Sequence, residues 1–353
     1  MSDDDGRKEV DKILEEMEKK IKRIYAKAEK EVAEKAADYM RRFAIKDQKW
    51  QEWVAEGKKT PEAYQAWRQS QLLMGERWEL MRAILAEDYT NADKIAKSVI
   101  EGYMPEVYAS AFNFGTYEIE HEALLSTSFT LYDRQTVERL LKGEDEIIPP
   151  IGGVAAEAVR AGKIQRWNEE QIQSVMLQGV LQGESIPKIA KRLEEVGETS
   201  HKAAIRDART ITNGVENAGH LDSYKRAEKM GIQCKKKWLA TLDGRTRHWH
   251  RLLDGQTAEM DKPFQSELGE IMYPGDPTAH PGDIYNCRCR IVSEIKGFEV
   301  DFTDPSIRRM DGLGDMSYDE WKEQRKAESD PITKQEDIGE SIKNSYIWKY
   351  RRG

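Results

Sequence analysis

The chain has 353 residues, with 56 Lys and Arg against 64 Asp and Glu, which gives a formal net charge of −8. Charged residues reach 34% and hydrophobic residues 39%, a balance that fits long solvated helices better than one thick globule. The length indicates two or three domains. The acidic total argues against a protein that coats nucleic acid over its whole surface. We interpret the basic stretches Arg41–Arg42, Lys235–Lys237 and the final WKYRRG as ordinary solvated charges, with local contacts to nucleic acid left open.

The first residues, MSDDDGRKEV, are acidic and are not followed by an apolar run, so no signal peptide is expected. No stretch of the sequence approaches the roughly 18 to 20 apolar residues that span a bilayer, and no membrane partner is expected. These features predict a soluble chain made in a cytoplasm. The three cysteines, Cys234, Cys287 and Cys289, are too few and odd in number for a disulfide framework.

A long first helix is predicted over residues 8–46, where Pro and Gly are absent between Arg7 and Arg42. Apolar residues recur there in steps of four and three, the spacing of a heptad seam. The seam residues are Val10, Leu14, Met17, Ile21, Ile24 and Ala28. Such a helix must bury its stripe against its own chain or a partner, and packing within the chain is the favoured reading.

Two further helices are predicted in the first half. Thr60 and Pro61 have the residue types of a helix N-terminus, and an apolar face that includes Met74 and Trp78 follows. A third start is expected at Thr90 or Asn91. The aromatic and β-branched stretch that follows this helix, residues 112–133, fits a strand, a loop or an irregular helix equally well.

The sequence pattern of the second half changes at two points. GEDEIIPPIGG at 143–153 marks a boundary, because its prolines and glycines stop a helix. Residues 167–196 predict a helix, a Gly-containing turn and a second helix capped by Ser185. Residues 201–231 predict a longer helix ended by Gly231.

From Ile232 to Glu299 the short apolar pieces between many Gly and Pro indicate a small α+β module. It has one strand running from 234 into a turn at Asp243, and another over 287–295 with Cys287, Cys289 and Ile291 on one face. A short helix is expected at 317–328. The predicted fold class is α+β, mostly α. The expected domains are a helical, heptad-bearing N-terminal domain (1–150), a helical lead-in (151–231), the small α+β module (232–300) and a polar C-terminal tail with a short helix (301–353).

Four side chains of the module have metal-ligand chemistry: His248, His250, Cys287 and Cys289. Two nitrogens and two thiolates suit tetrahedral zinc. However, a helix would separate the two histidines of H-x-H by about 200°, so both bind one ion only on a strand or turn. The competing reading makes His250 a hydrogen-bonding residue of a turn and the cysteines small buried hydrophobes.

The sequence contains little other evidence for an enzyme. A cysteine with His248 or His250 has the residue types of a thiol hydrolase, but a glycine-rich phosphate loop, G-x-S-x-G and H-E-x-x-H are all absent from the sequence. Four aspartates that a nuclease might use each sit beside Gly, where Asp favours turns: Asp243, Asp254, Asp276 and Asp283. We therefore predict no enzyme and no catalytic residue. Four arginines could pair with one or another of these aspartates, and such pairs would then hold the fold in place of a metal: Arg245, Arg247, Arg288 and Arg290.

The ordered motifs WLATLDGRTRHWHRLLDGQ, DKPF and MYPGDPTAHPGDIYNCRC resemble the phage head-morphogenesis family, also called phage Mu F-like minor head proteins. The resemblance covers about 170–295 and includes the helical lead-in. The motif residues, taken as structural, are Arg209, Trp238, Asp243, Arg245, Arg247, His250, Asp254, Gly255, Tyr273, Pro274, Asp276, Asn286, Cys287, Arg288 and Cys289.

This resemblance implies a minor structural protein of a tailed-phage or prophage head, made in the bacterial host cytoplasm and placed in the virion head interior near the portal. It implies association with the portal vertex and a role in head assembly and in DNA packaging or ejection. The implied partners are the portal protein and also packaged DNA and the scaffold or major capsid protein. The N-terminal domain would serve portal binding or self-association.

One branch of the family carries Cys-x-x-Cys where this chain has Arg247 and His250, and that set has the look of a metal site. This difference argues against a zinc site here. It favours the hypothesis that arginine–aspartate pairs hold the module together, and we therefore expect no cofactor. The alternative function is an effector or toxin-type enzyme, or a hydrolase, that uses the region of His250, Cys287 and Cys289, because relatives of this module are sometimes fused to toxin domains. A plain DNA-binding protein is a third reading, and the acidic total opposes it.

Overall fold

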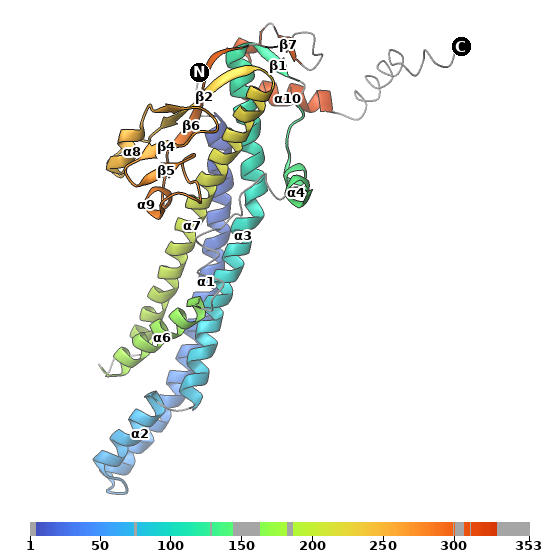
Figure 1. Cartoon of the computed structure of the whole chain (residues 1–353). Helices are drawn as coiled ribbons and strands as arrows, with labels where there is room; N and C mark the ends of the chain where they lie inside the picture. Colours follow the sequence, from blue (N-terminus) through green and yellow to red (C-terminus); the bar gives the residue numbers. More distant parts are fainter. Residues whose placement is uncertain are drawn as a thin grey trace. The chain divides into compact units, whose positions relative to one another are not determined.

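The computed structural model describes residues 5–73, 76–127, 129–143, 163–181, 186–298, 300, 307–310 and 312–329. Long helices dominate and the strands are short, which confirms the predicted α+β, mostly α class (Figure 1). The chain forms two compact units. One comprises Met1–Ile13, Tyr103–Ile151 and Thr210–Gly353, and the other Leu14–Gly102 and Gly152–Arg209. The four domain ranges expected from the sequence stay a prediction, and most of the boundary at 143–153 lies outside the described residues.

The described residues up to 123 form three helices: α1 (Asp5–Ala55), α2 (Pro61–Leu73) and α3 (Glu76–Ala123). The predicted start of α2 is confirmed, since the Ala63 N–H donates to Oγ1 of Thr60 at 3.1 Å. The predicted start at Thr90 or Asn91 is wrong, because α3 runs through it. The Thr90 hydroxyl donates to the Ala86 carbonyl one turn earlier at 2.7 Å, which satisfies it inside a helix. Met74 and the Trp78 side chain lie outside the described residues.

The buried stripe of α1 differs from the predicted heptad seam. Its steps are three, four, four and four residues, repeated twice: Val10, Ile13, Met17, Ile21, Tyr25, Ala28, Val32, Ala36 and Met40. Leu14 and Ile24, which a heptad places in the seam, are only half-buried. An α-helix has about 3.6 residues per turn, so a strict spacing of 3.5 drifts around the helix unless the helices supercoil. The additional steps of four turn the buried stripe the other way around the helix and so offset this drift.

The unit of Leu14–Gly102 and Gly152–Arg209 is a helical bundle that also contains α6 (Lys163–Leu181) and the first part of α7 (Ile186–Lys229). Side chains of α1 and α3 meet where the Tyr25 hydroxyl donates to Oδ1 of Asp93 at 2.5 Å. Residues 167–181 are helical as predicted, whereas Ser185 lies outside the described residues.

Helix α7 joins two helices that were predicted to be separate. A Cβ on Gly197 would lie 2.7 Å from a ring carbon of Tyr89, so the glycine permits close packing instead of ending the helix. The Tyr89 hydroxyl reaches the Leu193 carbonyl at 2.8 Å. The predicted end at Gly231 is confirmed: α7 stops at Lys229, and Gly231 has a φ of 88°.

The α+β module follows α7 directly. Strand β2 (Ile232–Leu239) is the centre of an antiparallel sheet in the order β3-β2-β6, with β3 at Thr257–Ala258 and β6 at Arg290–Phe298. A hairpin of β4 (Phe264–Ser266) and β5 (Gly269–Ile271) and two short helices, α8 (His248–Leu253) and α9 (Pro281–Ile284), complete it. Together these elements enclose a common apolar core.

The second predicted strand begins later than expected. β6 starts at Arg290, so Cys287 and Cys289 precede it. Asn286 adopts a left-handed φ of 53°, and the Cys287 N–H donates to the Ile284 carbonyl at 3.2 Å. This turn breaks the strand pattern but still directs both cysteines into the core, where they are buried.

The remaining elements include the continuation of α3 and the segments at the C-terminal side of the module. Residues 112–133, undecided from the sequence, continue α3 to Ala123 and then form β1 (Leu125–Thr127), which pairs antiparallel with β7 (Ile307–Arg309). Helix α4 (Arg134–Gly143) and the short 3-10 turn at Leu313–Asp315 follow in chain order. Helix α10 (Tyr318–Ser329) confirms the predicted short helix, and the tail beyond it is outside the described residues. Among the helices described, none is long and apolar enough to cross a membrane.

Candidate functional site

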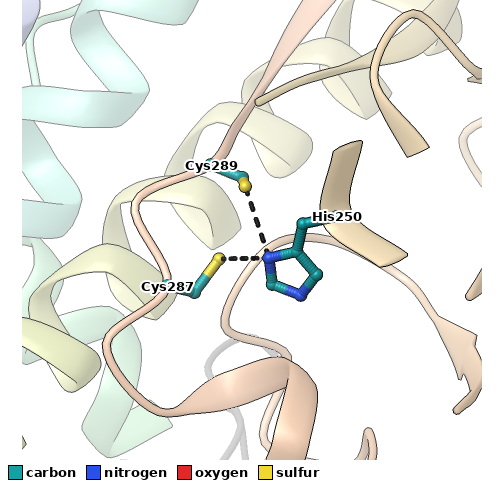
Figure 2. Close-up of side chains that lie close together, drawn as sticks. All are labelled: His250, Cys287 and Cys289. Atoms are coloured by element: carbon teal, nitrogen blue, oxygen red, sulfur yellow. Dashed lines mark hydrogen bonds between the residues drawn. The ribbon is translucent and has the colours of Figure 1, made fainter. Parts of the chain in front are cut away.

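Three side chains converge in the module: His250 of α8, and Cys287 and Cys289 from the segment between α9 and β6 (Figure 2). Nδ1 of His250 lies 3.7 Å from Sγ of Cys287 and 3.5 Å from Sγ of Cys289. Their three donor atoms lie within 4.8 Å of one another, and each residue is at most 3% exposed. The structure thus assembles three of the four predicted metal candidates into a closed, buried cluster.

Asp283 holds the imidazole from its other side. Nε2 of His250 lies 3.2 Å from Oδ1 of Asp283, which also accepts a hydrogen bond from Ser266 at 3.2 Å. A carboxylate in this position favours a proton on Nε2, which leaves the Nδ1 lone pair facing the two sulfurs. Asp283 is fully buried and its Oδ2 atom has no hydrogen-bond partner. From the sequence Asp283 was expected only in a turn or beside an arginine, because 33 residues separate it from His250.

Aromatic rings and the side-chain amide of a residue on α7 surround the cluster. The Trp238 ring packs edge-on against His250, with centroids 5.6 Å apart, and against Phe264 at 5.3 Å. Asn217 of α7 donates to the Cys289 carbonyl at 3.2 Å and accepts from the Ile291 N–H at 2.8 Å. These contacts fix the backbone that carries the cysteines and leave the cluster with almost no exposed surface.

An arginine–aspartate pair stands at the edge of the module. The Arg288 guanidinium binds both carboxylate oxygens of Asp243 at 2.6 Å, and this two-point contact holds the pKa of Asp243 well below its usual range. The Arg245 side chain lies 3.7 Å from the same carboxylate but is 81% exposed. Arg247 donates to the Tyr285 carbonyl. Of the arginines expected to stitch the fold, Arg288 therefore makes the close ion pair and Arg247 a backbone contact.

The other motif aspartates hold turns through backbone N–H groups. Oδ1 of Asp254 accepts from the Ala240 N–H at 2.8 Å, next to Gly255 in the left-handed region. Asp276 accepts from the N–H groups of Met272 and Thr278 at 3.0 and 2.8 Å. For these two aspartates the hydrogen bonds that hold the turn come from backbone N–H groups, as Asp beside Gly favours.

The remaining motif residues have structural partners. Tyr273 and Pro274 are buried beside the Asp276 turn. The Asn286 N–H donates to Oγ1 of Thr210 at 3.0 Å, which ties the turn before the cysteines to α7. Arg209 pairs with Glu18 of α1 at 2.6 Å.

His248 is the metal candidate that the structure leaves out of the cluster. Its side chain is 74% exposed, and its Nε2 lies 3.9 Å from Glu267. The reason is that α8 begins at His248, so His248 and His250 point in nearly opposite directions from one helix.

The predicted basic stretch Lys235–Lys237 also needs a correction, because Lys236 is not solvated. It is fully buried on β2, and its ammonium donates to the Met272 carbonyl at 2.8 Å and lies over the Phe264 ring. Burial lowers the pKa of Lys236 to about 8. Lys235 pairs with Glu259 at 2.5 Å, so this stretch offers little free positive charge.

The cluster can do two kinds of chemistry. It can hold a cation through two sulfurs and one nitrogen, or it can form a thiolate beside an imidazole. A hydrogen bond shared by the two cysteines lowers the pKa of Cys289 and raises that of Cys287, and His250 adds to the stabilisation of the Cys289 thiolate. The burial of all three residues opposes attack on an external substrate.

Comparison with known proteins agrees with the motif. Residues 170–292 match the family described as "Phage Mu protein F like protein". Minor head protein GP7 of Bacillus phage SPP1 is 33% identical over 174 residues, 46% of this chain and 54% of that protein. The resemblance inferred from the ordered motifs is thereby confirmed.

Two bacterial proteins are also similar. The NAD(+)–arginine ADP-ribosyltransferase EFV of Enterococcus faecalis is 27% identical over 238 residues, 65% of this chain and 45% of that protein. An uncharacterized protein of Haemophilus influenzae is 27% identical over 173 residues, 49% of this chain and 35% of its own length. The chain thus spans about half the length, or less, of these curated relatives. No solved structure matches significantly.

Proposed function

We propose that this chain, whose residues 170–292 form a phage Mu F-like region, is a minor structural protein of a tailed-phage or prophage head. The observation that carries the proposal is its 33% identity over 174 residues to a minor head protein. The structure adds physical support. The carboxylate oxygens of motif residues such as Asp254 and Asp276 accept backbone hydrogen bonds that hold turns, as a structural module requires.

We further propose that the protein associates with the portal vertex inside the virion head and acts in head assembly and in DNA packaging or ejection. The helical bundle supports a protein partner, because it leaves apolar side chains uncovered. Ile45 and Leu80 are 66% and 62% exposed. Leu80 also lines a pocket whose other members are Tyr39, Arg42, Phe43, Lys46, Met81 and Ile84. Apolar side chains gathered in a surface pocket, as around Leu80, are typical of binding sites.

Direct contact with packaged DNA has less support from the described residues. Arg41 and Arg42 both lie within ion-pair distance of Asp38, at 3.7 and 2.7 Å. Lys236 is buried. The final WKYRRG lies outside the described residues. A portal, scaffold or major capsid protein therefore fits the described surface better than DNA does.

Quantitative mass spectrometry of purified particles, with this chain scored against the portal protein, tests the proposal. A fixed ratio at or below the portal's own copy number supports a vertex-bound head component. Presence in immature heads with absence from mature particles makes the protein an assembly factor. Absence from both refutes a role in the head.

The alternative is an effector or toxin-type enzyme, and one geometric observation favours it. Cys289, His250 and Asp283 form a thiol–imidazole–carboxylate series. However, Cys289 and His250 are only 2% and 1% exposed, so a substrate has no path to the sulfur. Transfer of ADP-ribose is named for a relative of which this chain spans 45%. Transfer from NAD⁺ to an arginine acceptor by the purified chain, lost in Cys289→Ser, would establish the alternative.

A further inference from the structure

We propose that His250, Cys287 and Cys289 bind one Zn²⁺ ion, with Asp283 as the carboxylate that orients the histidine. The inference rests on the geometry of these four residues and does not depend on the proposed role in the phage head. The ion would join α8 to the segment between α9 and β6, across 37 and 39 residues of chain. Because all three residues are almost fully buried, the ion would hold these two segments together and would not meet an external substrate.

The spacing of the donor atoms fits the ion. Zinc bonds are about 2.3 Å to sulfur and about 2.0 to 2.1 Å to nitrogen, so a tetrahedral angle separates N and S by about 3.5 to 3.6 Å. Nδ1 of His250 lies 3.5 Å from Sγ of Cys289 and 3.7 Å from Sγ of Cys287. A single lone pair on Nδ1 can accept only one S–H donor well. One cation between the three atoms explains both distances at once.

The ring nitrogen of His250 that faces away from the sulfurs has the kind of partner that a zinc-bound histidine usually has. A ligating histidine commonly donates its other ring N–H to a carboxylate, which fixes the tautomer and raises the basicity of the ligand nitrogen. Oδ1 of Asp283 lies 3.2 Å from Nε2 of His250, and Ser266 steadies that carboxylate. The Nδ1 lone pair is therefore directed at the sulfurs.

The local charges also call for a cation. Asp283 is fully buried, and its Oδ2 atom has no hydrogen-bond partner. A buried carboxylate is costly unless positive charge lies near it. Zinc with two thiolates and this carboxylate carries one net negative charge. The guanidinium groups of Arg247 and Arg288 lie close enough for their positive charges to act on the cysteines and to offset part of it.

The ligand set selects zinc from among the divalent ions. Thiolate and imidazole ligands suit zinc, whereas magnesium and calcium require oxygen ligands. Within the described part of the chain the group has three members, which leaves the fourth position to a water molecule. The near-complete burial of the cluster keeps such a water away from bulk solvent.

The first experiment measures metal on the full-length purified chain. After incubation with equimolar Zn²⁺ and desalting, we expect one zinc per chain by inductively coupled plasma mass spectrometry. Replacing zinc with Co²⁺ should give the absorption of thiolate-bound, tetrahedral cobalt. A wild-type chain that retains no zinc and gives no cobalt–thiolate absorption overturns the proposal, and this readout needs no variant to fold.

The variants then identify the ligands. Cys287→Ser and Cys289→Ser should each lose the bound ion. The matched control is Cys234→Ser, because Cys234 is equally buried but its sulfur donates to the Tyr224 carbonyl. Retention of zinc at wild-type affinity by both cluster variants would also overturn the proposal. Asp283→Asn should keep the ion but bind it about 10- to 100-fold more weakly, as expected for an orienting partner.

Discussion

The Arg325 guanidinium donates to Oε2 of Glu120 at 2.6 Å, although 205 residues separate the two and both are almost fully buried. The same carboxylate oxygen accepts from the Trp321 indole at 2.7 Å. Oε1 accepts from the Thr127 N–H at 2.8 Å. Glu120 thus links α3 to both β1 and α10. A buried carboxylate with so many donors makes α10 an integral part of its unit.

Replacing Arg325 with Met should lower the free energy of unfolding by about 3–5 kcal/mol, because it leaves Glu120 charged and buried without its ion-pair partner. Chemical denaturation measures the change. The matched control is Lys326→Met on the same helix, whose partner Glu323 is exposed, and it should leave the melting temperature unchanged. Equal effects of the two substitutions would show that the buried ion pair of Arg325 stabilises the unit no more than the exposed pair of Lys326 does.

Gly275 should tolerate alanine far less well than Gly255 does. Both have left-handed φ angles, of 83° and 77°. A Cβ on Gly275 would lie 2.6 Å from Cα of Gly214 in α7, whereas nothing lies within 4 Å of one on Gly255. Gly255→Ala should therefore cost only the left-handed conformation, about 1–2 kcal/mol. Gly275→Ala should cost clearly more, because backbone must move. Similar losses in urea denaturation would contradict this packing.

Arg288→Lys should lower the melting temperature even though the positive charge is kept. An ammonium cannot make the two parallel contacts by which Arg288 holds both oxygens of Asp243. Arg245→Lys is the control in the same motif, since its exposed side chain lies 3.7 Å from that carboxylate, and it should have no effect. If the two variants melt alike, the two-point contact does not stabilise the module.

Sequence patterns predicted the elements whose signals are local. The Thr60–Pro61 start of α2 and the end of α7 before Gly231 depend on capping groups within a few residues, and both are confirmed. The prediction at Thr90 failed because its hydroxyl bonds to the Ala86 carbonyl within the helix instead of capping a new one. The predicted break between the two parts of α7 failed for a tertiary reason. From the sequence alone, Gly197 indicates a helix break. Only the structure shows that Tyr89, 108 positions earlier, occupies the space beside it.

The candidate site was predictable in residue type but not in arrangement. H-x-H and C-x-C identified His250, Cys287 and Cys289, and helical geometry explains why His248 drops out. The orienting carboxylate was hidden, because Asp283 lies in a Gly-Asp pair that is typical of a turn. The burial of Lys236 was hidden too, since Lys235 and Lys237 flank it and strand alternation alone turns it inward.

His220 should make stability depend on pH. Burial, aided by the charges of Arg290 and Arg7, lowers the pKa of His220 to about 3. Glu118 lies 3.7 Å from its Nδ1, and the Tyr224 hydroxyl lies 3.4 Å from it. In the unfolded chain the imidazole binds its proton near pH 6.5, so below that pH the unfolded state holds more protons than the folded state.

The free energy of unfolding should therefore be unaffected by this group above pH 6.5 and should fall as the pH drops from there towards 3. One proton accounts for at most about 1.4 kcal/mol per pH unit. Urea denaturation of the wild type and His220→Gln between pH 5 and about 7 isolates the effect from carboxylates. Burial raises the pKa of Glu216, and its titration acts in the opposite direction in both proteins. Parallel pH profiles would mean that the fold leaves the pKa of His220 unchanged. A wild type that becomes more stable relative to the variant as the pH falls would mean that His220 is protonated in the fold, with Glu118 as its counter-ion.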